Sequence, residues 1–582
     1  MLKGVPVSPG VAIARAHRLD QIPGSAPGGP LDAAAISAEA ARFEEASASA
    51  AEELDEIVER MRSTVGEDQA AIFRAHRQLV RDPGREPPLV AKVKSIIYGK
   101  KLCARAALQS ALDEYVALFG QVSDPYIRDR LADLKDVVGR VQAHLDGDRG
   151  AAVAEAGVPV VLVAAEILPS QAAMFDRLPV VGIVTEAGGT TGHAAILARA
   201  QGIPAVSGIR GILKEIRGGD LLIVDGREGN LLINPGPEVE SAYRKMQREY
   251  VDLRDALIVN ADQPAVTADG EPLELLANVN GAADAVTAKR TGAGGVGLYR
   301  TEYLFLTHPS VPSEEEQLAA YQLVIETSPK RTVTIRTLDL GGDKHVPYLG
   351  SQTEANPFLG WRSIRLTMTY PELFAAQLRA ILRSGEFGDI SLLFPMITTL
   401  EEVRQVKQVV QKTQRKLKLE RDMPIGVMIE VPAAAMCVGD LLDEVDFVSI
   451  GSNDLIQYVM AADRDNPKVA HLCEPFSPAI YRLLNYVIAA CVSKNKPVTL
   501  CGEMAAKPRC FLPLLGMGLR RFSMSPAFVP TIKEVARRVQ VPKAREVAAA
   551  VLRLRTVAEV REYLAQQLDL ICPNVAQLDT VE

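Results

Sequence analysis

Residues 424–452, PIGVMIEVPAAAMCVGDLLDEVDFVSIGS, contain the pattern that decides the fold. A short run rich in β-branched residues comes first, a stretch rich in Ala and Leu follows, and a second strand-like run ends at a glycine. Such a unit is typical of two parallel strands joined by a crossover helix. The same unit recurs on both sides of this stretch.

Eight strand-like runs alternate with helical stretches beyond Asp269. Eight β/α units over roughly 300 residues predict a (β/α)8 barrel. Chemistry in such barrels takes place at the carboxyl ends of the strands, so charged residues that end these runs are candidates for a site. The runs are ELLANVN (274–280), GGVGLYR (294–300), TVTIRTLDL (332–340), ISLLFPMI (390–397), PIGVMIEV (424–431), DFVSIGS (446–452), KPVTLC (496–501) and RRFSMS (520–525).

A second α/β unit is predicted upstream of the barrel. The first 20 residues, with GVPVSPGVAIARAHRL at 4–19, predict a short strand pair. These strands have no core of their own, so we expect them to join the later unit. Its strand-like runs are VPVVLVAA (158–165), VVGIVTEA (180–187), IPAVSG (203–208) and LLIVDG (221–226).

The segment between these two parts is predicted to be an all-helical insertion. From about Asp32 to His144 apolar residues such as Phe43, Ala50 and Leu54 recur at helical spacing. A charged helix from Val239 to about Ala256 predicts a linker. The expected domains are an α/β domain at 1–21 and 146–236, a helical subdomain at 32–145, a linker at 237–267 and the barrel at 268–575.

Length, charge and cysteine content limit the classes of protein to which the chain can belong. A length of 582 residues predicts two to four domains, and a net charge of −7 argues against a nucleic-acid binder. The seven cysteines form no Cys-x-x-Cys pair and are odd in number, which favours a reducing cytoplasm over a disulfide framework. The longest apolar run, Val158 to Ala165, is too short to span a membrane.

Three arginines lie at or after the ends of barrel runs: Arg300, Arg336 and Arg464. Each alone favours a structural ion pair. Three at one barrel mouth favour an anion such as a phosphate, because the guanidinium group matches phosphate geometry and clustered positive charges repel one another.

Two carboxylates, Glu430 and Asp454, follow adjacent runs. Mg²⁺ commonly takes one or two carboxylates with substrate oxygens and waters, so the pair predicts a magnesium site. The alternative is that both merely pair with the arginines. No His or Cys ligand is evident beside them, which favours magnesium over zinc.

His193 lies in TEAGGTTGHAAILARAQGIP (185–204), where small residues lead into a helical pattern. A histidine at a helix N-terminus lies where free N–H groups favour an anion, and its imidazole is a competent nucleophile toward phosphorus. The other six histidines, at positions 17, 76, 144, 308, 345 and 471, are expected at the surface or in packing.

The chain resembles Enzyme I of the bacterial sugar phosphotransferase system over essentially its whole length. The likeness rests on GGTTGHAAILARA (188–200), GLYRTEYLF (297–305), IRTLDLGGDK (335–344), EANPFLGWR (354–362), GVMIEVPAA (426–434), SIGSNDLIQYVMAADR (449–464) and LCGEMA (500–505). The resemblance implies a phosphohistidine swivelling domain, a helical insertion that docks the phosphocarrier protein HPr, and a barrel that binds phosphoenolpyruvate and forms a homodimer.

The resemblance also implies a role for each matching residue. His193 would take the phosphoryl group and pass it to HPr, with release of pyruvate, and Cys501 would be the proton donor. Mg²⁺ would bind Glu430 and Asp454. Phosphoenolpyruvate would be held by Arg300, Arg336, Asn453, Asp454 and Arg464, with Arg362 as a further member.

The chain departs from the family pattern beside the predicted nucleophile. Thr190 and Gly192 stand where an arginine and a serine are common, and Leu168 stands where a threonine is common. Two other functions stay open at this point. One is a relative of pyruvate phosphate dikinase or phosphoenolpyruvate synthase without the ATP-grasp domain, and the other is a regulatory phosphoenolpyruvate sensor.

Overall fold

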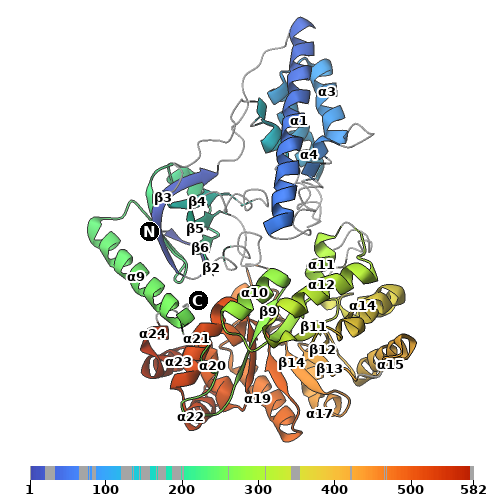
Figure 1. Ribbon diagram of the computed structural model, residues 1–582. Helices are drawn as coiled ribbons and strands as arrows, with labels where there is room; N and C mark the ends of the chain where they lie inside the picture. Colours follow the sequence, from blue (N-terminus) through green and yellow to red (C-terminus); the bar gives the residue numbers. More distant parts are fainter. Residues whose placement is uncertain are drawn as a thin grey trace. The chain divides into compact units, whose positions relative to one another are not determined.

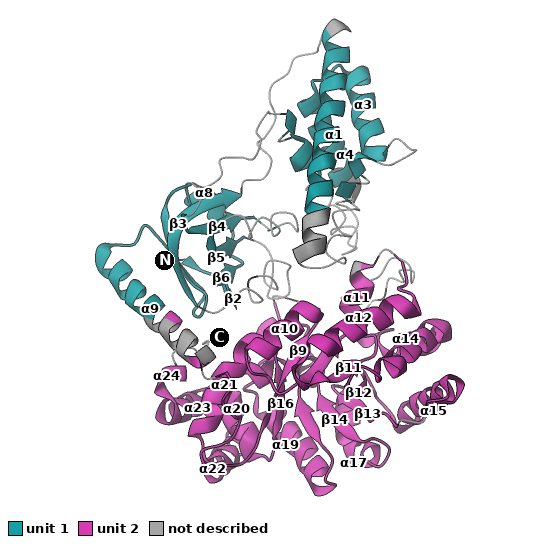
Figure 2. Ribbon diagram, in the orientation of Figure 1, with its two compact units in different colours: residues 1–248, 580–582 teal, residues 249–579 magenta. Residues whose placement is uncertain are grey.

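The protein forms two compact units, residues 1–248 with 580–582 and residues 249–579 (Figure 2). The computed structural model describes residues 2–8, 10–19, 33–64, 76–77, 79–81, 87–119, 134, 137–142, 144–145, 158–165, 167, 179–186, 198, 202–259, 261–308, 310–341, 354, 356–419, 422–464, 466 and 468–576.

The second unit contains a closed barrel of eight parallel strands, as predicted. Neighbouring strands pair in sequence order, and the last pairs with the first. The strands are β9 (Glu274–Val279), β10 (Val296–Arg300), β11 (Thr332–Arg336), β12 (Asp389–Phe394), β13 (Ile425–Ile429), β14 (Phe447–Ile450), β15 (Val498–Leu500) and β16 (Arg521–Met524).

Helices cover the outside of this barrel (Figure 1). Three of them begin with a capping box, in which Ser313, Thr399 or Thr556 and the glutamate three residues later satisfy the first backbone N–H groups. The helices that connect or follow the strands are α10 (Ala282–Arg290), α11 (Glu302–Thr307), α12 (Glu314–Thr327), α13 (Ile364–Thr369), α14 (Pro371–Ser384), α15 (Leu400–Leu417), α16 (Pro432–Met436), α17 (Val438–Leu441), α18 (Ser452–Met460), α19 (Pro478–Ser493), α20 (Pro508–Gly516), α21 (Val529–Arg538), α22 (Val541–Val551), α23 (Val557–Ile571) and α24 (Pro573–Ala576).

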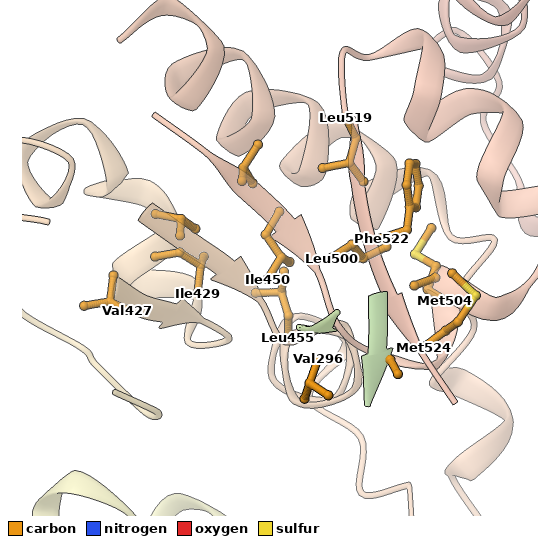
Figure 3. Close-up of a cluster of buried hydrophobic side chains, with 14 of the residues drawn as sticks. Val296, Val427, Ile429, Ile450, Leu455, Leu500, Met504, Leu519, Phe522 and Met524 are labelled. Atoms are coloured by element: carbon orange, nitrogen blue, oxygen red, sulfur yellow. The ribbon is translucent and has the colours of Figure 1, made fainter. Parts of the chain in front are cut away.

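The barrel has two separate apolar layers. Val427 and Ile429 of β13 belong to the large core between strands and helices, which Figure 3 shows with Ile450, Leu500 and Phe522. The intervening Met428 belongs to a small cluster with Leu298, Leu393, Phe447 and Cys501. Because alternate side chains of a strand point to opposite faces, this small cluster fills the barrel interior.

The first unit contains an eight-stranded sheet in the order β1-β8-β7-β3-β4-β5-β6-β2. The N-terminal strands join it, as predicted. A short helix, α8 (Ile212–Glu215), follows β6. The strands are β1 (Leu2–Lys3), β2 (Val5–Ser8), β3 (Val11–Leu19), β4 (Val160–Ala164), β5 (Val180–Thr185), β6 (Ala205–Ser207), β7 (Leu221–Asp225) and β8 (Asn230–Ile233).

The prediction that the first strands pair with each other was wrong. β2 pairs with β6, whereas β3 lies between β4 and β7. Pro6 explains the position of β2, because a proline lacks the N–H that an inner strand must donate and is tolerated at a sheet edge.

A helical subdomain lies between β3 and β4 in the sequence, as predicted. Its well-described helices are α1 (Ala33–Thr64), α3 (Pro88–Lys100) and α4 (Ala104–Phe119). The predicted stripe of Phe43, Ala50 and Leu54 is fully buried in their shared core. His76 is also buried, so it is a packing residue rather than a surface contact.

Helix α9 (Pro237–Val259) occupies the place of the predicted linker, and the boundary between the units falls inside it. Its first half packs on the sheet, where Gln247 Nε2 donates to Val11 O at 3.0 Å. Tyr243 and Met246 pack against the buried cluster of Val11, Ile13 and Ile223. Among the residues that the structure describes, no helix is both long and apolar enough to cross a membrane.

Candidate active site

A network of buried charges lies at the carboxyl ends of β11, β13 and β14. Asp339 links two guanidinium groups, with Oδ2 3.2 Å from Arg336 Nη2 and Oδ1 3.1 Å from Arg362 Nη2. All three side chains are nearly inaccessible to solvent. Burial makes unpaired charges very costly, so each must find a partner here.

Arg336 is the last residue of β11, and its register partner on β10 is Arg300. Two predicted arginines therefore lie side by side at adjacent strand ends. Arg336 also pairs with Glu302, at the start of α11. Its buried Nε has no hydrogen-bond acceptor among the residues described for this chain.

Arg362 comes from a loop rather than a strand. It precedes α13 and follows the 3-10 helix η4 (Pro357–Leu359). Gly341 leaves room for Arg362 beside the network, because a Cβ at position 341 would lie 2.5 Å from Arg362 Cβ. Its φ of +103° also favours glycine. Nη2 lies 3.5 Å from Asp454 Oδ2, and Nη1 donates to Tyr458 Oη at 3.3 Å. Its Nε also has no acceptor within the described part of the chain.

Glu430 directly follows β13 and is 1% exposed. Its Oε1 accepts from the backbone N–H of Met396 at 2.6 Å. Burial raises the pKa of Glu430 to about 8, and the charges of Asp454 and Asp339 add to the rise. Gly451 keeps this carboxylate close to β14, since a Cβ there would lie 2.7 Å from Oε2.

Asp454 lies in the first turn of α18, directly after β14. Arg464 is its looser partner, with Nη2 3.9 Å from Oδ1 and a side chain 28% exposed. The preceding Asn453 accepts through Oδ1 from the backbone N–H of Glu503 at 2.9 Å. The amide NH₂ of Asn453 thus lies on the other branch of its side chain, where it can donate to an anion.

Cys501 follows β15 and is 2% exposed. Its thiol donates to the carbonyl of Ile450 at 3.3 Å. Burial is the main cause that raises the pKa of Cys501, to about 11, so the sulfur keeps its proton near neutral pH. The nearby guanidinium groups of Arg336 and Arg300 act in the opposite direction but are outweighed by burial.

The donor set fits a hard divalent cation better than a soft one. No group of three His, Cys, Asp or Glu side chains able to hold a metal occurs within the described ranges. Glu430 and Asp454 offer buried carboxylate oxygens that destabilise one another when both are ionised. A cation that takes few protein ligands and keeps waters or substrate oxygens matches such a pair.

The structure does not bring every predicted residue to this network. His193 lies outside the described residues, as do Thr190, Gly192 and Leu168. At the barrel the structure places Arg300, Arg336, Arg362, Glu430, Asn453, Asp454, Arg464 and Cys501.

Sequence reasoning missed several residues of the network. Glu302 pairs with Arg336, and Ser363 donates to Asp339. Tyr458 holds the loop of Arg362, since its hydroxyl donates to Phe358 O at 2.5 Å. Tyr458 was detectable, because it lies four residues after Asp454 and hence on the same helix face. The partners of Glu302 and Ser363 depend on contacts that no local pattern reveals.

Comparisons with known proteins cover nearly the whole chain. Residues 255–541 match the family model of the PEP-binding domain of PEP-utilising enzymes. Residues 3–130 match the N-terminal model of PEP-utilising enzymes, and residues 157–229 match their mobile-domain model.

Two curated relatives align over almost their full length. The chain is 39% identical to a phosphoenolpyruvate-protein phosphotransferase of Bacillus sp. (strain S) over 98% of each chain. It is 36% identical to the protein of that name from Haemophilus influenzae, over 98% of this chain and 99% of the relative. An NMR solution structure of Enzyme I matches 43% of this chain and 99% of its own, at 31% identity and a TM-score of 0.36.

Proposed function

The chain belongs to the family of phosphoenolpyruvate-protein phosphotransferases, and from this premise we propose how its own residues carry out the reaction. His193 takes the phosphoryl group of phosphoenolpyruvate, and pyruvate is released. The phosphohistidine then passes the group to a histidine of an HPr-like phosphocarrier protein, as the first step of a sugar phosphotransferase system. The geometry of the barrel network supports the remaining steps of this proposal.

The observation that carries this proposal is the pair of buried Nε–H groups on Arg336 and Arg362 that lack acceptors among the described residues. Asp339 holds both guanidinium groups through Nη2, so each Nε–H is a donor whose position is already fixed. A buried donor without an acceptor is costly, and a phosphate or carboxylate oxygen would satisfy it. Arg300, Arg464 and the amide of Asn453 complete a binding site for a small, highly charged anion.

Glu430 and Asp454 are the residues that would hold Mg²⁺. The ion supplies positive charge that offsets the negative charge on the transferring phosphoryl group. Without such an ion, burial raises the pKa of Glu430, and repulsion from the neighbouring Asp454 and Asp339 adds to the rise. The protein's part is to keep both carboxylates buried and oriented.

Cys501 supplies the proton that makes pyruvate. Loss of the phosphoryl group leaves an enolate whose methylene carbon must gain a proton. A thiol whose pKa is raised by burial keeps its proton until a strong base such as the enolate carbon is present. The C–H bond then forms as the S–H bond breaks, and water returns a proton to the thiolate.

Membership of the family supports the partners and domain roles that we propose next. We assign residues 1–21 and 146–236 to the swivelling phosphohistidine domain and 32–145 to the subdomain that docks an HPr-like carrier. The imidazole of His193 must visit both the barrel and the carrier, so these parts move between steps. We also propose a homodimer formed through the barrel and a cytoplasmic location.

Incubation with labelled phosphoenolpyruvate and Mg²⁺, without nucleotide, tests this proposal. Acid-labile label is expected on His193 and none on the variant His193→Ala. The matched control His471→Ala changes an exposed histidine and is expected to label normally. Labelling that requires ATP would favour the dikinase alternative, and binding without any labelling would favour the sensor.

A further inference from the structure

The backbone around Cys501 is held from several sides, in part by side chains with no role assigned above. Its backbone N–H donates to Ile450 O at 3.0 Å, and its carbonyl accepts from Asn278 Nδ2 at 2.8 Å. Two residues later, the N–H of Glu503 donates to Asn453 Oδ1. The backbone around the thiol is therefore fixed by side chains as well as by the β15 ladder.

Asn278 reaches Cys501 from a strand that does not neighbour β15. It lies on β9, and β16 separates the two strands in the closed barrel. Its Oδ1 accepts from Ser523 Oγ, on β16, at 2.6 Å. Since one branch of the amide accepts from a hydroxyl and the other donates to a carbonyl, this hydrogen-bond pattern fixes the orientation of the amide.

Ser523 is itself held in place. It is fully buried, and its side chain lies against Gly297 of β10. A Cβ on Gly297 would lie 2.5 Å from Ser523 Oγ, so only glycine leaves room for the hydroxyl. The chain Ser523–Asn278–Cys501 thus links three strand ends inside the barrel.

We infer that Asn278 and Ser523 are positioning residues that fix the point from which Cys501 delivers its proton. This inference rests on the proposed function, in which Cys501 protonates the enolate carbon. The hydrogen bond to the carbonyl of Cys501 sets the plane of its peptide, and that plane sets the direction of the Cα–Cβ bond. A small shift of the sulfur lengthens the path to the carbon, and misplacement by about 1 Å can slow a reaction about 100-fold.

The variants Asn278→Leu and Ser523→Ala test this inference. Both are expected to slow single-turnover formation of pyruvate by about 10-fold to 100-fold. Phosphoenolpyruvate binding, measured by calorimetry with Mg²⁺, is expected to change by less than about twofold, because the anion site is untouched. The matched controls Asn485→Leu and Ser493→Ala, on the outer helix α19, are expected to leave the rate unchanged.

Two readouts separate positioning from a general weakening of the barrel. The solvent deuterium isotope effect on pyruvate formation is expected to rise in Asn278→Leu, because proton transfer becomes rate-limiting. Return of the phosphoryl group from a phosphorylated carrier to His193 is expected to be normal, since that step needs no proton on carbon. A loss of both steps together, or an unchanged isotope effect, overturns the inference.

The double variant Asn278→Leu/Cys501→Ala distinguishes this inference from the proposed function. If Asn278 acts through Cys501, the double variant is no slower than Cys501→Ala alone. If the losses of rate in the two single variants add in the double variant, Asn278 acts elsewhere. If Asn278→Leu keeps the parent rate while Cys501→Ala is slow, only the positioning role is overturned. An unaltered rate in Cys501→Ala would remove the proposed proton donor and the positioning role with it.

Discussion

Two ion pairs of equal length, one in the helical subdomain and one at the barrel mouth, show what burial does to a charge. Arg42 Nη1 lies 3.1 Å from Glu39 Oε1 on α1, and Arg362 Nη2 lies 3.1 Å from Asp339 Oδ1. The side chains of the first pair are 55% and 17% exposed, whereas both of the second are 2% exposed. The two pairs therefore differ in burial and not in the distance between their charged atoms.

The difference indicates which pair serves function. An exposed pair costs little to desolvate and contributes about 0–1 kcal/mol. A buried pair loses hydration that its attraction barely offsets, so it is weak evidence for stability. Buried charges at the barrel mouth are better explained by the anion and cation that they are proposed to bind.

Removal of a buried guanidinium should give the largest effect. Arg362→Met leaves Asp339 and Asp454 without one partner each, and breaking a buried pair costs about 3–5 kcal/mol. We expect a lower unfolding midpoint by calorimetry and a loss of phosphoenolpyruvate affinity of at least about 100-fold. Arg404→Met, which removes an exposed arginine of the outer helix α15, is the control. A wild-type affinity in Arg362→Met would remove Arg362 from the substrate site.

A second prediction compares two buried thiols. Burial raises the pKa of Cys491 to about 12 and is also the main cause that raises that of Cys501, to about 11. Only Cys501 lies at a strand end beside the charged network. Cys501→Ala is expected to form pyruvate at least about 100-fold more slowly in a single turnover, while Cys491→Ala keeps the parent rate.

Equal rates in Cys501→Ala and the parent protein would contradict the role of this thiol as the proton donor. The same variant should still accept a phosphoryl group onto His193 from a phosphorylated carrier, because that step does not involve the enolate. This second measurement separates a lost proton donor from a misfolded barrel.

The eight barrel strands and the strand-end residues were predictable from the sequence because both depend on local patterns. A β-branched run shows a strand, and its last residues lie at the mouth whatever the register. Arg336, Glu430 and Cys501 are of this kind. The contact of Asn278 with the site was not predicted, because its side chain donates to the carbonyl of Cys501 across the intervening strand β16. Nor did any pattern show that β2 and β3 would lie apart in the sheet.

A third prediction concerns pH and the carboxylates of the mouth. The pKa of Glu430 is raised to about 8 from 4.5, so the folded, metal-free protein holds a proton that the unfolded chain releases. Stability contributed by this group is present below about pH 4.5 and is lost as pH rises toward about 8. Mg²⁺ needs the ionised form, so its affinity should rise by up to about tenfold per pH unit from pH 6 to 8.

Calorimetric titration with MgCl₂ in buffers of different ionisation enthalpy measures the proton released on binding. Glu430→Gln has no proton to release and should bind the ion weakly without this pH dependence. If the Mg²⁺ affinity of the parent protein is constant from pH 6 to 8, Glu430 is already ionised at pH 6. That result would contradict a pKa of Glu430 raised by burial.

The smallest effect is expected for the exposed pair on α1. Arg42 and Glu39 lie three residues apart on one helix face, an arrangement worth about 0.2–0.5 kcal/mol. Each side chain has a second partner, since Arg42 Nη2 donates to Leu145 O at 2.6 Å and Glu39 Oε2 accepts from Ala104 N at 2.8 Å. Single variants therefore report more than the ion pair.

A double-mutant cycle isolates the pair. Glu39→Gln keeps an acceptor for Ala104 but removes the charge, and Arg42→Met removes the guanidinium. In the cycle the loss of the bond to Leu145 cancels, so the coupling energy from urea unfolding is expected to be about 0.2–0.5 kcal/mol. It should shrink at high salt, because exposed charges are screened within about 10 Å at 0.1 M. A coupling energy above about 2 kcal/mol would contradict the comparison, because the exposed pair would then contribute as much as a buried pair. Self-phosphorylation should be unchanged in all three variants, because Arg42 and Glu39 lie on α1, in a different unit from the proposed anion site.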